Sequence, residues 1–257
     1  MSLRPGPAMV SVPLTTLWVG PDRPRDVDRP VVAAAPDAVR WLADLDSHPD
    51  DDESGDGRLG LHGRVESQLV AGEPVRVVGL DEAKTWAQVV CPWQPSPKSP
   101  DGYPGWVPAA HLRQVPDASG SVAAPAATAR PAAGSGEHPA LALARDHLGL
   151  AYLWGGLSPL GFDCSGLVHH TWRRLGVVVP RDADAQAEAA LSPDPGEARP
   201  GDLYFFGRPG RVVHHVGIVV SPGRMVHASE TRGAVVEEDL TADRLEALVA
   251  TGRLPTS

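Results

Sequence analysis

Several features are scarce or missing in this sequence of 257 residues. Its two cysteines, Cys91 and Cys164, are too few for a disulfide framework. No run of about 18 apolar residues occurs, which excludes a conventional membrane-spanning helix. The net charge is −9 and no segment is basic, which argues against nucleic acid as a partner. The first residues also lack the pattern of a secretory signal peptide, so we expect a cytoplasmic protein.

Glycine and proline are abundant instead, with 27 residues of each. Residues 116–137 consist almost wholly of Ala, Pro, Gly, Ser and Thr, a composition that cannot bury enough apolar surface to fold. We therefore expect a linker at 116–137 that joins two domains, at residues 8–115 and 138–257.

The first domain has the patterns of a β domain. Residues 75–78 and 86–90 are short β-branched runs separated by a polar turn, which predicts two strands. Residues 37–45 carry Trp41 and Leu45 at helical spacing, which predicts one small helix.

The second domain has helix signals first and strand signals afterwards, which favours an α+β fold. Pro139 suits a first helical turn, and Gly149 and Gly176 suit helix ends. We predict helices at 139–148, 164–175, 183–190 and 240–249, and strands at 202–206, 212–220, 224–228 and 235–237.

The residues with the clearest chemical potential are one cysteine and two histidines. Cys164 stands at the predicted start of a helix, where backbone N–H groups favour the thiolate and should lower the pKa of the thiol. A hairpin through residues 221–223 would place His215 and His227 side by side on two strands. Such a set suits a nucleophile with its base, but a buried histidine pair, or a metal site with Cys164 as third ligand, also fits.

Ordered motifs narrow these alternatives, because together they resemble the NlpC-type family of bacterial cell-wall cysteine peptidases. The motifs are YLWGG at 152–156, FDCSGL at 162–167, PRD at 180–182 with Gln186 after it, PGDL at 200–203, HVGI at 215–218 and VHA at 226–228. The resemblance implies a papain-like catalytic domain that uses no cofactor and no metal.

Site residues follow from this resemblance position by position. It implies that Cys164 is the nucleophile, His215 the general base and His227 the residue that orients that base. It further implies that Tyr152 helps to stabilise the oxyanion. Three positions correspond to residues that line the substrate site: Trp154, Asp163 and Ser165.

The first domain resembles the bacterial SH3-like domain of one subgroup, the γ-D-glutamyl-L-diamino acid endopeptidases (dipeptidyl-peptidase VI). The matching stretches are VESQL at 65–69, GEPV at 72–75 and GYPGWVP at 102–108. The helical stretch near Trp41 resembles an insertion in that β-barrel domain. The resemblance implies that Glu66 and Tyr103 bind the free amine of the substrate's L-alanine, and that Asp182 lies near this amine.

The resulting expectation is a monomeric hydrolase that recycles murein peptides. It would cleave L-Ala-γ-D-Glu from meso-diaminopimelate or L-lysine. A papain-like acyltransferase or amidase would use the same cysteine, but the acidic residues at 66, 163 and 182 do not suit an apolar acyl channel. A non-catalytic wall-binding module would not need Cys164, His215 and His227 together.

Overall fold

The computed structural model describes residues 3–48, 52–116, 124–129, 137–192, 197–208 and 212–255. Its internal contacts divide the chain into two units. Unit 1 comprises Met1–Ala123 and Trp154–Leu160, and unit 2 comprises Ala124–Leu153 and Gly161–Ser257. Most of the expected linker at 116–137 lies outside the described residues.

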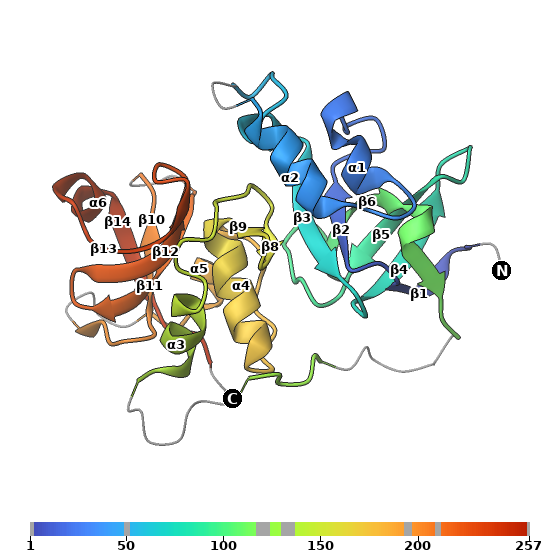
Figure 1. The fold of residues 1–257 in the computed structure, drawn as a ribbon. Coiled ribbons are helices and arrows are strands. Elements are labelled where there is room, and N and C mark those ends of the chain that lie inside the picture. The colour runs from blue at the N-terminus through green and yellow to red at the C-terminus, as the bar shows by residue number, and fades with distance from the viewer. Residues whose placement is uncertain are drawn as a thin grey trace. The chain divides into compact units, whose positions relative to one another are not determined.

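Unit 1 contains an antiparallel sheet of seven strands in the order β3-β2-β6-β5-β4-β1-β7 (Figure 1). The seven strands of this sheet are β1 (Gly6–Val10), β2 (Leu14–Trp18), β3 (Val65–Val70), β4 (Pro74–Leu80), β5 (Trp86–Cys91), β6 (Tyr103–Pro108) and β7 (Leu112–Gln114). Unit 1 also contains the short strand β8 (Leu157–Ser158), which is not part of this sheet. Both predicted strands are present, within β4 and β5. No pairing among the described residues joins the end strands β3 and β7, so the sheet is not shown to close into a barrel.

A helical insertion lies between β2 and β3 of this sheet. It contains α1 (Arg29–Val32) and α2 (Ala38–Asp46), which confirms the predicted helix. The carboxylate of Asp37 accepts the backbone N–H of Arg40 and caps α2. The buried Trp41 indole donates to Asp28, whose carboxylate also pairs with Arg25, so the insertion is anchored by a buried polar contact.

Unit 2 combines helices with an antiparallel sheet of five strands in the order β13-β12-β11-β10-β14. Its helices are α3 (Pro139–Arg145), α4 (Cys164–Arg174), α5 (Ala183–Ala189) and α6 (Ala242–Ala247). Its strands are β9 (Gly161–Phe162), β10 (Leu203–Phe206), β11 (His215–Ser221), β12 (Arg224–Ser229), β13 (Ala234–Asp239) and β14 (Leu248–Gly252). This confirms an α+β unit.

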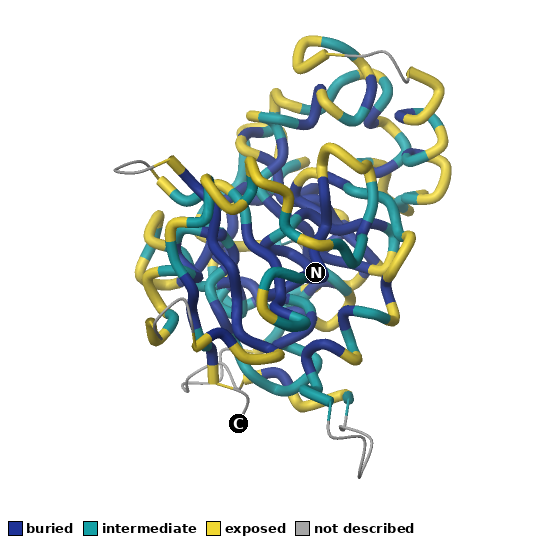
Figure 2. The backbone as a smooth tube through the Cα atoms, turned by 90° about the vertical axis from the view of Figure 1, so that its left-hand side faces the viewer, coloured by how far each residue is buried: buried dark blue, intermediate teal, exposed yellow. Residues whose placement is uncertain are grey.

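The core of unit 2 forms where α3 and α4 pack against β11 and β12 (Figure 1). Leu167, Val168 and Trp172 project from α4 into the same buried cluster as Val216 and Val226. Every residue of β2 and of β10 is buried, and Figure 2 shows the buried and exposed stretches of the backbone in different colours. None of the described helices is long and apolar enough to cross a membrane.

The predicted closing helix at 240–249 is only partly right. The helix α6 ends at Ala247, and the chain continues as strand β14, in which Ala250 pairs with Phe205 and Gly252 with Leu203. Without β14, the backbone groups of β10 would be unpaired on that side. The hydrogen bonds gained by pairing with β10 outweigh the local helical preference of residues 248–249. The predicted strand at 212–220 likewise begins only at His215.

Candidate active site

Cys164 is the first residue of α4, the helix at the centre of unit 2. Asp163 precedes it in an extended conformation, and its carboxylate accepts the backbone N–H of Gly166 at 2.6 Å. This cap ends the extended chain and begins the helix at the cysteine. Cys164 itself is partly exposed, while Ser165 and Gly166 are buried. The local sequence therefore presents the sulfur at a helix N-terminus.

A buried arginine holds this helix start in place. Arg181 is 1% exposed, and its guanidinium donates to both carboxylate oxygens of Asp163, at 2.7 and 3.0 Å. It also donates to the Ser165 hydroxyl at 3.0 Å. The side chains of Asp163 and Ser165, which the resemblance assigns to substrate, are thus engaged by Arg181. Contact of these two residues with substrate stays a prediction.

His215 and His227 are brought together by the β11–β12 hairpin. Nε2 of His215 lies 2.8 Å from Nδ1 of His227, and the two rings are almost perpendicular. Gly217 permits this approach, because a Cβ there would lie 2.4 Å from the Met225 sulfur and 3.2 Å from the His227 Cβ. Beside His215, the backbone N–H of Val216 donates to the Cys164 thiol. The cysteine and both histidines therefore belong to one constellation in unit 2.

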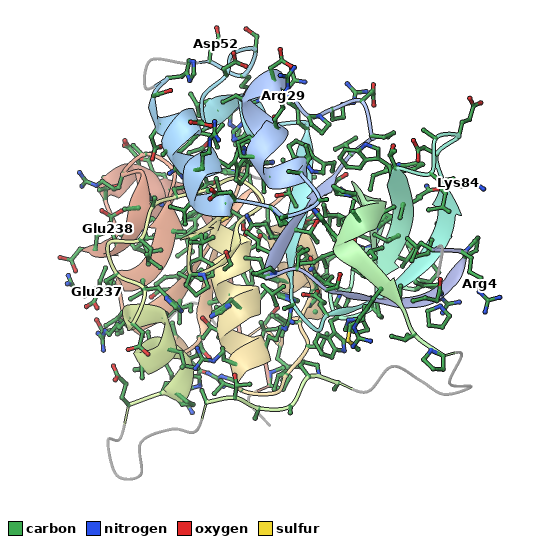
Figure 3. All side chains as sticks on the ribbon, turned by 45° about the vertical axis from the view of Figure 1, so that its right-hand side comes forward. Arg4, Arg29, Asp52, Lys84, Glu237 and Glu238 are labelled. Atoms are coloured by element: carbon green, nitrogen blue, oxygen red, sulfur yellow. The ribbon has the colours of Figure 1, made fainter. Side chains whose placement is uncertain are left out.

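Glu238 extends this constellation, and the sequence interpretation missed it. It lies on β13, next to Glu237 (Figure 3), and its carboxylate is 3.0 Å from Nε2 of His227. Arg232 and Arg244 pair with the same carboxylate. Strand alternation puts Glu238 on the same face of β13 as Val236, and the pairing of Val236 with His227 brings the glutamate to the histidine, which the sequence pattern alone does not show.

The carboxylate of Glu238 determines how protons are arranged along the histidines. A carboxylate only accepts, so His227 donates through Nε2 and its Nδ1 accepts from Nε2–H of His215. The other nitrogen of His215, Nδ1, then carries a lone pair. A lone pair at this position is what a base for the Cys164 proton requires.

The electrostatics of the site favour neutral groups. Burial lowers the pKa of His215, and the charges of His227 and Arg244 lower it further, to about 3. Burial and Arg244 likewise lower the pKa of His227. Burial and the nearby Asp163 raise the pKa of the Cys164 thiol to about 12, although the N–H groups of Val216 and Ser165 oppose this rise.

The prediction of a lowered pKa for Cys164 is therefore wrong. The N–H groups at the helix start do act in the expected direction. However, loss of hydration at a mostly enclosed sulfur disfavours the thiolate more strongly. These shifts favour a neutral Cys164 thiol and a neutral His215 imidazole in the free protein.

Tyr152 lies close to the same constellation. Its backbone N–H donates to Gly233, and it bridges to Phe162, two residues before Cys164. Burial raises the pKa of its phenol, and the neighbouring charges of Cys164 and Asp163 contribute. The hydroxyl thus stays protonated and can donate a hydrogen bond.

Asp182 is the residue before α5, which lies beside the start of α4. Gln186 in α5 donates to the Ser165 carbonyl at 3.0 Å. Asp182 is half-buried in an extended conformation, and its side chain does not cap α5. Its proposed role near a substrate amine stays a prediction.

Glu66 and Tyr103 come together in unit 1, on β3 and β6. The Tyr103 hydroxyl donates to Glu66 at 3.0 Å. Lys98, which the sequence interpretation also missed, donates through Nζ to Glu66 at 2.5 Å and to the Tyr103 hydroxyl at 2.8 Å. This trio is an ammonium ion held by a carboxylate and a phenol. A lysine in a turn carries no sequence signal that could have revealed the contact.

Trp154 belongs to unit 1 by its contacts. Its indole donates to the Val65 carbonyl at 3.0 Å, and its ring contacts the His62 ring with centroids 4.0 Å apart and the ring planes tilted by 50°. The following Gly155 has a φ of +73°, and a Cβ there would lie 2.5 Å from the Val65 side chain. The Trp-Gly-Gly motif therefore places Trp154 beside the strand that carries Glu66.

No group of three or more His, Cys, Asp or Glu side chains within the described ranges is arranged to hold a metal ion. The Nε2 of His215 and the Nδ1 of His227 face one another, so these two atoms are already used. The arrangement suits acid–base and nucleophilic chemistry by side chains.

Comparisons with known proteins agree with this chemistry. Residues 149–250 match the model of the NlpC/P60 family. The γ-D-glutamyl-L-lysine dipeptidyl-peptidase of Bacillus subtilis (strain 168) is 29% identical over 85% of this chain and 88% of its own length. The enzyme of the same name from Bacillus cereus (strain ATCC 10987) is 25% identical over 89% of this chain and 84% of its own length.

A solved structure has the same fold over nearly the whole chain. The crystal structure of an NlpC/P60 family protein from Bacillus cereus ATCC 10987 superposes with a TM-score of 0.80 and 24% identity, and covers 96% of this chain and 99% of that one. The family match spans the residues that carry Cys164, His215 and His227. Residues 149–250 of this chain belong to the NlpC/P60 family of cysteine peptidases.

Proposed function

We propose that this chain hydrolyses murein peptides that begin with a free L-alanine, and that it cleaves between γ-D-glutamate and the following diamino acid. The observation that carries the proposal is the constellation at Cys164, where the Val216 N–H reaches the sulfur and His215 is hydrogen bonded to His227. The names of the relatives that match most of the chain support the bond and the substrate.

In the first half of the reaction, the Cys164 sulfur attacks the γ-carbonyl carbon of D-glutamate while His215 Nδ1 accepts the thiol proton. The carbonyl oxygen becomes an oxyanion, which the Cys164 backbone N–H and the Tyr152 hydroxyl stabilise. The C–N bond then breaks, and His215 gives its proton to the leaving amine. A thioester between the cysteine and the dipeptide remains.

In the second half, water attacks the thioester and His215 accepts a water proton. The C–S bond breaks, the sulfur recovers a proton, and the dipeptide leaves with a free γ-carboxylate. His227 and Glu238 keep His215 in the tautomer that both halves need. Because the thiol starts neutral, each turnover begins with a proton transfer rather than with a stored thiolate.

The pH dependence of the reaction tests this neutral pair. The pKa of His215 is lowered, so its Nδ1 remains a free base as the pH falls through 6.5, the ordinary value for histidine. We expect kcat/KM to stay level from about pH 7, where the substrate's amine is still charged, to about pH 5, and to decline only in more acidic buffer. Initial rates over this range provide the measurement. A decline centred at or above 6.5 would contradict the proposed state of His215.

We further propose that unit 1 is an SH3-like domain, that its Glu66 and Tyr103 receive the ammonium group of L-alanine, and that Trp154 and Asp182 also contact the substrate. The hydrogen bond between Tyr103 and Glu66 supports the amine role, because it presents a fixed carboxylate. A blocked alanine has no ammonium group with which to bind this carboxylate. The third residue of the substrate is proposed to be L-lysine or meso-diaminopimelate.

A pair of peptides tests the substrate proposal. We expect L-Ala-γ-D-Glu-L-Lys to release its dipeptide, and the N-acetylated peptide to react at least about tenfold more slowly, since a charge-assisted hydrogen bond is lost. The readout is kcat/KM from chromatography of the products. The variant Glu66→Gln should reduce this preference, because its amide does not attract an ammonium group. Equal cleavage of both peptides by the wild type would refute the amine site.

The two alternative functions predict different reaction products. An acyltransferase would transfer the dipeptide to an added amine in preference to water, so product analysis with such an amine separates it from a hydrolase. A wall-binding module would release no dipeptide at all.

A further inference from the structure

Lys98 occupies an unusual position for a lysine in a surface turn. It lies between β5 and β6, where Ser96 and Ser99 form an isolated bridge and the Ser96 hydroxyl accepts the Lys98 N–H. Instead of extending into solvent, its side chain turns to Glu66 and Tyr103. The turn therefore supplies an ammonium group to the residues proposed to receive the substrate amine.

The contacts at Nζ are those expected of an ammonium receptor. Nζ donates to the Glu66 carboxylate and the Tyr103 hydroxyl, and it lies 4.6 Å from the centre of the Tyr103 ring. A carboxylate, a phenol and an aromatic face together recognise a compact cation. Tyr103 is 2% exposed, so half of this receptor is fixed by packing.

The choice of lysine is also informative. The sequence contains 23 basic residues, of which only Lys84 and Lys98 are lysines. Arginine carries a planar fork, whereas the lysine Nζ is a compact ammonium group, the same chemical group as a peptide N-terminus. The side chain of Lys98 therefore carries the same ammonium group as the proposed ligand.

We propose that Lys98 is a built-in competitor for the ammonium site, and that the substrate's N-terminus binds by displacing its Nζ from Glu66 and Tyr103. The inference rests on the proposed function, because it takes Glu66 and Tyr103 as the amine site. The lysine side chain is 43% exposed, so its head can move into water while one ammonium replaces another. Lys98 thereby keeps Glu66 paired in the free enzyme and weakens substrate binding.

Kinetics of one variant pair test the competition. In Lys98→Met, we expect KM for L-Ala-γ-D-Glu-L-Lys to fall about fivefold, the upper range for a partly exposed ion pair, while kcat changes little. The matched control is Lys84→Met, because Lys84 is exposed at the tip of the β4–β5 hairpin (Figure 3). An unchanged or increased KM in Lys98→Met would overturn the inference.

Nuclear magnetic resonance gives a readout that does not depend on turnover. Selective ¹³C labelling of lysine produces two Cε signals, assigned with the Lys84→Met variant. When the Cys164→Ala protein is titrated with L-Ala-γ-D-Glu, we expect the Lys98 signal to move toward the position of a solvated lysine and the Lys84 signal to stay. The N-acetylated dipeptide should move neither signal.

The outcomes separate this inference from the proposed function. A Lys98 signal that stays fixed while calorimetry shows the dipeptide saturating the protein would overturn the displacement. A shift caused equally by the N-acetylated dipeptide would do so too, since that ligand has no ammonium group. By contrast, wild-type protein that releases no dipeptide would refute the proposed reaction, even if L-Ala-γ-D-Glu displaced Lys98.

Discussion

The variant Cys164→Ala is expected to lose dipeptide release by at least about a thousandfold, because no other group in the constellation can form the thioester. The residue follows a capped helix start, and alanine suits a helix, so the fold of α4 should remain. The measurement is kcat for L-Ala-γ-D-Glu-L-Lys, with circular dichroism to confirm the fold.

The second cysteine provides the matched control. Cys91 is fully buried in β5, where burial and the nearby Glu73 raise the pKa of its thiol. Cys91→Ala removes a thiol from unit 1 and should retain kcat. Retained activity in Cys164→Ala, or equal loss in both variants, would contradict the assignment of Cys164 as nucleophile.

The variant Arg181→Met should lower the free energy of unfolding of unit 2 by about 3–5 kcal/mol, the range for breaking a buried ion pair. The methionine would fill part of the space but leave the Asp163 carboxylate, whose side chain is 11% exposed, without its cation. Asp163 also caps α4, so the start of the helix should be the first part to loosen. Hydrogen exchange of the α4 amides measures the effect directly.

Arg224→Met is the control for the same replacement in the same unit. Arg224 pairs with Glu237 and Asp239, but its side chain is 38% exposed and its partners keep access to water. Its loss should change exchange in α4 little. If Arg181→Met were equally mild, Arg181 would not be what holds the start of α4.

The elements that could be predicted are those with local signals. The helix at Cys164 has a capping aspartate before it, an apolar stripe along it and glycine after it. The hairpin that pairs His215 with His227 follows from two apolar runs around a Pro-Gly turn. Such signals involve residues that are close in sequence, so they can be recognised without knowledge of the tertiary fold.

The features that could not be predicted depend on distant residues. The strand β14 exists because β10 has an unpaired side, and its sequence alone resembles the end of a helix. The raised pKa of Cys164 comes from enclosure by surrounding chain, which outweighs the helix start. Glu238 and Lys98 reach their partners across 11 and 32 positions of sequence. No periodicity encodes such contacts.

The segment Trp154–Leu160 has a consequence for how the chain folds during synthesis. It belongs to unit 1 although it follows α3 of unit 2 in the sequence. The side chain of Gln68 on β3 accepts hydrogen bonds from the Leu157 N–H and the Ser158 hydroxyl. These two hydrogen bonds cannot form until the segment has left the ribosome. A nascent chain ending before residue 154 therefore holds an unfinished unit 1, and vectorial folding completes it only as the segment preceding Cys164 emerges.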